Sequence, residues 1–402
     1  MSYGVSALLT SWLTSHQVTI ESVSDEVLLN IFRYVLDVSP RSWPRLVHTC
    51  RQWRHFVFAS QGALRLRLFF TPGTPVQKSL HYWPVLPIVV QYGGSLALSQ
   101  PTLEDEDNIM AALKHSDRVI SISLAITTSL LKKLSTLAGV FSELQDLVLL
   151  SRDDVLLTIM MPSAFRWGQR LRRLHSTGIA FPALLQLLSS SKNLIDLQLH
   201  EVFLPWQFSP ALLMKALSKL GHLRSLSLHF CSAVHYHSSL PPYLESIFLP
   251  VLTRLNYQGN MEYLEDILAS IDAPFLEDVE IIFFDHPILA LSKLNGILDQ
   301  IEIYRSHFGA HILSSEPTIT ISLTQPGTPT CLKLQLLCKP IRVQICSMAQ
   351  ICLDFSSFLI NNKRNLLIGT TRPPGRMDSS HSRELMELLN PFAGKSCFIS
   401  TQ

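Results

Sequence analysis

The stretch SDEVLLNIFRYVLDVSPRSWPRLVHTCRQWRHFVFAS, from Ser24 to Ser60, has more apolar surface than a module of its size needs for its own core. Ser24 is suited to cap a helix N-terminus, and the acidic Asp25 and Glu26 follow in the first turn. Apolar residues then form two adjacent stripes at helical spacing, together wider than the ~100° that a surface helix usually buries. The stripes are Val27, Ile31, Tyr34 and Val35, and beside them Leu28, Phe32 and Leu36. Such a helix has two surfaces to contact.

A break at Ser39 and Pro40 separates this helix from a second one, which is also broadly apolar. Its apolar positions are Leu46, Val47, Cys50, Trp53, Phe56 and Val57, and Arg51 and Arg54 remain on the solvent side. The pattern alone leaves two possibilities open. The module either packs wholly into the rest of its own chain or keeps one face for a partner.

The spacing of DEVLLNIFRYVL and LVHTCRQWRHFVFAS closely resembles the F-box, especially the form common in fungal F-box proteins. The resemblance implies a three-helix module that docks on a Skp-type adaptor of an SCF ubiquitin ligase. The positions that match the family's adaptor contact are Val27, Leu28, Ile31, Phe32, Leu46, Val47, Cys50 and Trp53. The family usually has Leu-Pro before the acidic pair, whereas this chain has Val23 and Ser24 there.

Composition limits the function classes. With 402 residues, 47% of them hydrophobic and 16% charged, the chain is expected to form two domains or an elongated array around a large core. Its 33 basic and 31 acidic residues create no global field for nucleic acid or anionic lipid, so neither is expected as a partner. No apolar run reaches the ~18 residues of a membrane span, and residues 1–18 lack signal-peptide features. Seven cysteines without framework spacing indicate reduced thiols and an intracellular location, cytoplasmic or nuclear.

After Ser60 the sequence predicts a strand over Leu64–Phe70, a short helix entered through Pro75, and a strand over Leu86–Tyr92. This stretch resembles the segment that follows the F-box in the fungal proteins. We therefore predict an N-terminal tail over 1–18, an F-box over 19–60 and a repeat array over 61–402.

The array is predicted from a recurring pattern, apolar-x-x-apolar-x-apolar, separated by helical patterns that end near Gly139 and Gly221. The pattern begins at Val119, Leu144, Leu171, Leu194, Leu223, Leu252 and Leu276. Successive starts are 25, 27, 23, 29, 29 and 24 residues apart, within the ~20–29 of leucine-rich repeats. The fold class is thus α/β: the helical F-box followed by an irregular leucine-rich-repeat-like solenoid with a parallel sheet on its concave face.

A doubly wound sheet also alternates strands and helices, but it usually has strands apolar on both faces and a glycine-rich turn for nucleotides. The segments DLQLH (Asp196 to His200) and SLSLH (Ser225 to His229) instead alternate apolar and polar residues, as solenoid strands do. Strands are also predicted over 319–323, 331–338 and 350–355, and a helix over 383–392. No polar capping repeat follows, which leaves open that the chain is a shortened member of its family.

The sequence contains only weak motifs for metal binding or catalysis. The segment HFCSAVHYH contains His229, Cys231, His235 and His237, but its spacing matches no common zinc motif, so we predict no metal site. No nucleotide-binding, serine-hydrolase or metalloprotease signature occurs. We therefore expect neither an enzyme activity nor a cofactor.

These features predict a substrate-recognition subunit of an SCF-type ubiquitin ligase, bound to a Skp-type adaptor and the cullin core, with a substrate protein on the array. The alternative is an interaction scaffold outside any ligase. In each repeat strand, the residues that flank the middle apolar position point away from the core, because side chains alternate across a strand. The predicted substrate-binding residues are Arg173, His175, Asp196, Gln198, Ser225, Ser227, Arg254 and Asn256.

Overall fold

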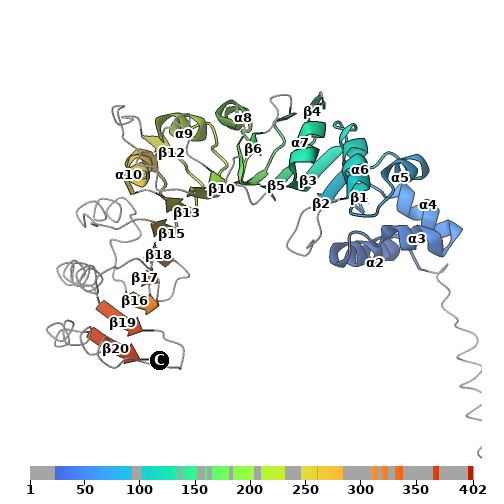
Figure 1. Cartoon of the computed structure of the whole chain (residues 1–402). Coiled ribbons are helices and arrows are strands. Elements are labelled where there is room, and N and C mark those ends of the chain that lie inside the picture. The colour runs from blue at the N-terminus through green and yellow to red at the C-terminus, as the bar shows by residue number, and fades with distance from the viewer. Residues whose placement is uncertain are drawn as a thin grey trace, which may run out of the picture. The chain divides into compact units, whose positions relative to one another are not determined.

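The computed structural model describes residues 23–92, 102–134, 136–137, 139–151, 159–160, 165–180, 184–202, 210–230, 246–259 and 261–283, and the strands 309–315, 318–324, 331–337, 365–370 and 397–401 (Figure 1). The chain divides into two compact units, Met1–Val89 and Val90–Gln402.

The first unit begins with three helices. Its elements are α2 (Asp25–Val38), α3 (Trp43–Thr49), α4 (Arg51–Ala59), β1 (Leu68–Phe70), α5 (Val76–Tyr82) and the start of β2 (Ile88–Tyr92). The predicted cap is confirmed, because the hydroxyl of Ser24 accepts a hydrogen bond from the Val27 N–H at 3.4 Å. The strand predicted over Leu64–Phe70 is shorter than expected. Arg65 has a φ of 49°, outside the extended region, so only the end of that stretch forms β1.

Cys50 breaks the second predicted helix in two. Its backbone is extended, with φ −155° and ψ 170°, and its Sγ accepts a hydrogen bond from the Trp53 N–H at 3.4 Å. The apolar pattern predicted one continuous helix across this position, and that prediction was wrong. Neither proline nor glycine marks the break, and Cys50 supplies a side-chain cap of a type that helix-start rules do not anticipate.

The core of the first unit is aromatic. The ring of Phe32 lies 4.8 Å from that of Trp53 and 5.9 Å from that of Phe56, both edge to face. The indole N–H of Trp43 donates to the carbonyl of Arg67 at 2.8 Å, which fastens the helices to the chain just before β1. Buried residues from the three helices are Leu28, Phe32, Leu36, Trp43, Leu46, Val47 and Val57.

The second unit alternates strands and helices. Its elements up to residue 202 are α6 (Leu103–Leu113), β3 (Val119–Ile126), α7 (Thr128–Leu134), β4 (Gly139–Phe141), β5 (Asp146–Ser151), β6 (Ile159–Met160), β7 (Phe165–Trp167), β8 (Arg173–Thr177), β9 (Ile179–Ala180), α8 (Leu184–Ser190) and β10 (Asp196–Val202). The elements that follow are α9 (Pro210–Leu217), β11 (Ser225–Phe230), β12 (Ile247–Phe248), β13 (Arg254–Gly259), α10 (Met261–Ser270), β14 (Ile271–Asp272), β15 (Asp278–Phe283), β16 (Gly309–Ser315), β17 (Thr318–Thr324), β18 (Cys331–Leu337), β19 (Asn365–Thr370) and β20 (Cys397–Thr401).

A large parallel sheet runs through this unit, which confirms the α/β class. From β3 the strand order is β3-β5-β8-β10-β11-β13-β15-β18, and each neighbouring pair is parallel. The order of these strands does not reverse between β3 and β15, whereas a doubly wound sheet reverses at its switch point. Helices α8, α9 and α10 pack in sequence along one side of the sheet (Figure 1).

The strand register follows the apolar pattern. The middle apolar residues of successive strands pair directly across the sheet and are buried: Ile122, Leu147, Leu174, Leu197, Leu226, Leu255 and Val279. Because neighbouring side chains in a strand point to opposite faces, this single row fixes which residues lie on the other face.

Several local predictions fail in the second unit. Helices α7 and α9 end at Leu134 and Leu217, so neither Gly139 nor Gly221 caps a helix. Strands β17 and β18 form where expected, but β17 is antiparallel to both β16 and β18, unlike the strands before it. The strand predicted over 350–355 and the helix over 383–392 lie outside the described residues.

Candidate functional site

Helix α2 has an apolar face that the chain leaves exposed. Val27 and Ile31 are 49% and 48% exposed, and Tyr34 and Val38 are more exposed still. We call these four residues the outer face of α2. The second apolar stripe of the helix is buried in the first unit. The two stripes therefore occupy different environments, one in the core and one in solvent.

The eight residues predicted to contact an adaptor separate into these two environments. Leu28, Phe32, Leu46 and Val47 are buried, so their side chains contribute to the core of the first unit. Trp53 is half-buried, whereas Val27, Ile31 and Cys50 are exposed. Only the last three offer a partner a largely accessible side chain without rearrangement of the helices. Adaptor contact by any of the eight stays a prediction.

Trp53 has a buried polar atom without a partner. Its indole Nε1 is shielded from solvent and finds no hydrogen-bond acceptor among the described residues. A buried donor in this state costs about 1–3 kcal/mol.

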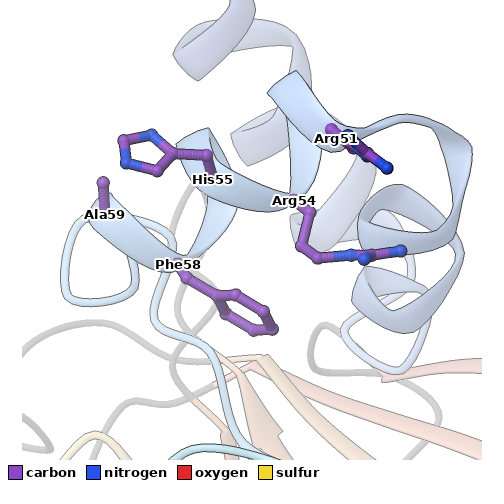
Figure 2. A pocket seen from close by; sticks show the side chains of 5 residues that line it. All are labelled: Arg51, Arg54, His55, Phe58 and Ala59. Atoms are coloured by element: carbon purple, nitrogen blue, oxygen red, sulfur yellow. The ribbon is translucent and has the colours of Figure 1, made fainter.

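An open hollow of about 420 Å³ lies along α4, lined by Arg51, Arg54, His55, Phe58 and Ala59. Figure 2 shows the guanidinium groups of Arg51 and Arg54 directed to one side of the helix and the His55 ring to the other. Both arginines are exposed, as the sequence predicts, and the Arg54 Nε also donates to the Val47 carbonyl at 2.9 Å. Arg54 thus links α4 to α3.

The sheet of the second unit brings the predicted substrate-binding residues together. One row in register contains Asp146, Arg173, Asp196, Ser225, Arg254 and Asp278. A second row contains Val148, His175, Gln198, Ser227, Asn256 and Glu280. Both rows belong to the face opposite the buried apolar row, which we call the open face. Substrate binding there stays a prediction.

Charges on the open face are partly paired. The Arg173 Nε lies 2.6 Å from a carboxylate oxygen of Asp146, and this hydrogen bond, with the charges of Asp146 and Asp196, raises the pKa of Arg173. Asp196 accepts hydrogen bonds from the Gln198 amide at 3.1 and 3.3 Å. The amide carries no charge, so it orients the Asp196 carboxylate without neutralising it.

Three histidines meet on the open face. The rings of His200 and His229 are stacked, with centroids 3.9 Å apart and planes inclined by 4°, and the His175 ring meets His200 edge to face at 5.0 Å. We call these residues the histidine cluster. The sequence prediction included only His175. His200 and His229 were missed as site residues because they follow the last apolar position of their strands, although DLQLH and SLSLH end in the same residue.

Hydrogen bonds link His200 and His229 of the cluster with Ser227, Asn256 and Glu280. The Asn256 amide nitrogen donates to Glu280 at 3.3 Å, so its oxygen, 3.1 Å from the His229 Nε2, accepts from that ring. The hydroxyl of Ser227 lies 3.3 Å from the His229 Nε2 and 2.9 Å from the His200 Nε2. The His229 Nε2–H is therefore directed to both the Asn256 oxygen and the Ser227 hydroxyl, and the role of Ser227 toward the His200 Nε2 is set by the tautomer of that ring.

The environment disfavours protonation of the cluster. Burial, followed by the charges of His229 and His175, lowers the pKa of His200 to about 4. Burial also lowers the pKa of His175 against the opposing charge of Asp196. Burial likewise lowers the pKa of His229 against the opposing Asn256 hydrogen bond and Glu280 charge. Each ring therefore resists protonation more than a solvated histidine does.

Metal binding finds no geometric support in the described part of the chain, where no group of three or more His, Cys, Asp or Glu side chains could hold an ion. The other members of the HFCSAVHYH segment, from Cys231 onward, lie outside the described residues.

Among the helices that the structure describes, none has the length and apolar character needed to span a membrane.

Comparisons with protein-family models, with curated proteins and with solved structures gave no match.

Proposed function

We propose that the protein is a substrate-recognition subunit of an SCF-type ubiquitin ligase, with Asp25–Ala59 acting as an F-box on a Skp-type adaptor. The observation that carries this proposal is the outer face of α2. Within the described part of the chain, α2 already buries one stripe in the core of the first unit and leaves the second about half-exposed or more. Apolar residues at i, i+4, i+7 and i+11 form one strip along such a helix, the arrangement by which helices dock on a partner.

Burial of this apolar strip by a partner is more favourable than its exposure to solvent. Burying one such side chain fully stabilises a complex by about 1.5–3 kcal/mol. The four side chains are about half-exposed or more, so covering them supplies several kcal/mol before the costs of association.

The open face supports the second half of the proposal, in which an irregular leucine-rich-repeat-like array holds a substrate protein. Its two rows present carboxylates, guanidinium groups, amides, hydroxyls and imidazoles at the regular spacing of neighbouring strands. Mixed polar groups at fixed spacing suit a patterned protein surface better than a uniformly charged polymer.

In this function the chain acts by holding a substrate protein close to the ubiquitin-conjugating enzyme. The first unit would fix the chain to the adaptor and cullin core, and the second would hold the substrate. A lysine of the substrate then meets the ubiquitin-conjugating enzyme at a high local concentration. The reactive groups belong to the partners, and no catalytic residue is assigned to this chain.

Reconstitution tests the proposal against the scaffold alternative. The tagged full chain is purified from cells with its bound proteins, then mixed with adaptor, cullin core, ubiquitin and the activating and conjugating enzymes. The proposal expects ubiquitin to be transferred to a co-purified protein only when the chain and the adaptor are both present. Stable capture of a partner without adaptor binding or ubiquitin transfer would favour the scaffold.

A further inference from the structure

The hollow along α4 is one continuous face of that helix. Its five residues, Arg51, Arg54, His55, Phe58 and Ala59, stand at i, i+3, i+4, i+7 and i+8, the spacing at which side chains share one side of a helix. Two arginines and a histidine therefore stand beside a phenylalanine and an alanine on a single surface (Figure 2). The hollow is thus both basic and partly apolar.

The part of the first unit that follows α2 is basic. From Arg41 to Val89 the sequence contains seven arginine or lysine residues and no aspartate or glutamate: Arg41, Arg45, Arg51, Arg54, Arg65, Arg67 and Lys78. Both arginines of the hollow are exposed, and the ion pairs found among the described residues do not include them. Their charges therefore remain available to an acidic partner.

We propose that this hollow binds an acidic segment of a partner protein other than the adaptor, with an aspartate or glutamate side chain held by Arg51 and Arg54 and an apolar side chain against Phe58. The inference goes beyond the proposed function and does not depend on it.

The spacing of the two arginines suits a carboxylate. Residues three apart on a helix have Cβ atoms about 5–6 Å apart, and Figure 2 shows the guanidinium groups of Arg51 and Arg54 on the same side of α4. A carboxylate has two oxygens that accept charged hydrogen bonds from guanidinium groups, so one acidic side chain can contact both arginines. His55, on the other side of the same face, offers a further hydrogen-bonding group.

Two of the lining side chains are already held in place. The Arg54 Nε donates to the Val47 carbonyl at 2.9 Å, which orients the guanidinium group in advance of binding. The ring of Phe58 meets that of Trp43 edge to face, with centroids 6.2 Å apart, and the Trp43 indole is itself hydrogen-bonded to the Arg67 carbonyl. A partner that meets ordered side chains loses less conformational entropy on binding.

Helix geometry separates the hollow from the predicted adaptor contact. Trp53 and Phe56 are the residues of α4 whose rings pack on Phe32 of α2. At about 100° per residue, they point to the side of α4 roughly opposite the hollow. The hollow and the outer face of α2 therefore belong to different surfaces of the first unit, and an adaptor on the outer face of α2 does not need the hollow.

An acidic peptide suits this surface better than a nucleic acid does. Proteins that bind single-stranded nucleic acid combine a long basic groove with several aromatic rings on which successive bases stack. The hollow has one aromatic ring, Phe58, which is half-buried. A carboxylate next to an apolar side chain needs only the groups that the hollow contains.

Peptide selection tests the proposal. A phage-displayed library of random twelve-residue peptides is selected on the full chain and depleted on the variant Arg51→Gln/Arg54→Gln, which removes peptides that bind elsewhere. We expect the remaining peptides to contain more aspartate and glutamate than the library, with apolar residues next to them. Fluorescence anisotropy with the corresponding synthetic peptides then measures their affinity in solution.

Arg51→Gln should bind these peptides about fivefold more weakly, the upper range for an accessible ion pair, and the double variant at least about tenfold more weakly. Raising the salt concentration from about 0.05 M to about 0.5 M should also weaken binding, because exposed charges are screened. The matched control is Lys78→Gln, an exposed basic residue of α5 outside the hollow, which should bind as wild type does. If the double variant does not fold, Arg51→Gln replaces it in the depletion step, because the Arg51 side chain is exposed.

Three results would overturn the ligand assignment: no enrichment of any peptide, enrichment without acidic residues, or unchanged binding by folded Arg51→Gln. Tighter binding of a twelve-nucleotide single-stranded DNA, weakened in the same variant, would also overturn it and assign the hollow to nucleic acid.

Adaptor binding, measured on the same preparations, separates this inference from the proposed function. Adaptor binding that is lost together with peptide binding in the folded double variant would show that the hollow belongs to the adaptor contact, which contradicts a separate partner. Arginine-dependent capture of acidic peptides by a chain that binds no adaptor would support this inference and contradict the ligase.

Discussion

Phe32 and Trp53 meet edge to face between α2 and α4, with ring centroids 4.8 Å apart and planes inclined by 66°. This contact lies inside the first unit, because Phe32 is only 1% exposed. Its neighbour Ile31, one residue earlier, faces solvent. Two consecutive residues of one helix thus face different environments, Ile31 the solvent and Phe32 the core.

Replacing Phe32 by alanine should destabilise the first unit by about 3–5 kcal/mol, because the cavity sits among rings that cannot all collapse into it. Urea denaturation followed by circular dichroism measures this loss. The control Tyr34→Ala, on the exposed side of the same helix, should cost less than about 0.5 kcal/mol. Equal losses in the two variants would show that Phe32 is not a core residue.

Glu106 should be more important for stability than its acidic neighbour Asp107. It is buried and accepts hydrogen bonds from Thr127 at 3.0 Å and Ser129 at 2.8 Å, and it pairs with Lys133 at 3.2 Å. Glu106→Ala leaves these donors without their acceptor and should cost about 2–3 kcal/mol.

Asp107 pairs with the same Lys133 but is exposed, so Asp107→Ala should cost less than about 1 kcal/mol. Thermal denaturation of both variants checks the difference. A loss in Asp107→Ala as large as that in Glu106→Ala would mean that the pairing with Lys133, rather than the buried hydrogen bonds, ties α6 to α7.

Stability of the second unit should fall as the pH falls from 7 to 4. His200 has a folded pKa of about 4, below the ~6.5 of the unfolded chain, so the unfolded state binds more protons between these values. The stabilisation is complete above pH ~6.5 and is lost as the pH approaches 4. After allowance for solvent screening, His200 should account for about 1 kcal/mol of this loss.

Denaturation curves at several pH values, for wild type and His200→Gln, measure the effect. The exposed His222 provides the control, and His222→Gln should keep the wild-type slope. A His200→Gln variant with an undiminished slope would show that the cluster is not held neutral by the fold.

Much of the fold could be predicted from the sequence where one local signal dominates. Ser24 precedes two acidic residues and an apolar run, and it caps α2 as expected. In the second unit, the middle leucine of each repeat must be buried, and a shift of one residue would expose the whole row. This constraint predicts the register of all the strands from that of Ile122 to that of Val279. It does so without information on the helices between them.

The failures occur where tertiary contacts or unusual caps decide the structure. Cys50 ends one helix and caps the next with a sulfur atom. The ring contacts of Phe32 with Trp53 and Phe56, which are distant in the sequence, were not predicted, and the adaptor contact predicted for Phe32 stays a prediction. The stack of His200 on His229 requires neighbouring strands in register, and a lone histidine at a strand end does not reveal it.

The most direct measurement of the central claim is calorimetric titration of the full chain with a Skp-type adaptor. We expect saturable binding with one adaptor per chain. The double variant Val27→Asp/Ile31→Asp places charge on the outer face of α2 and should weaken binding by at least about 30-fold, as expected for hot-spot residues. Val85→Asp, at an exposed apolar residue outside α2, should bind as wild type does. Absence of binding by wild type, or unchanged binding by a folded double variant, would contradict the account.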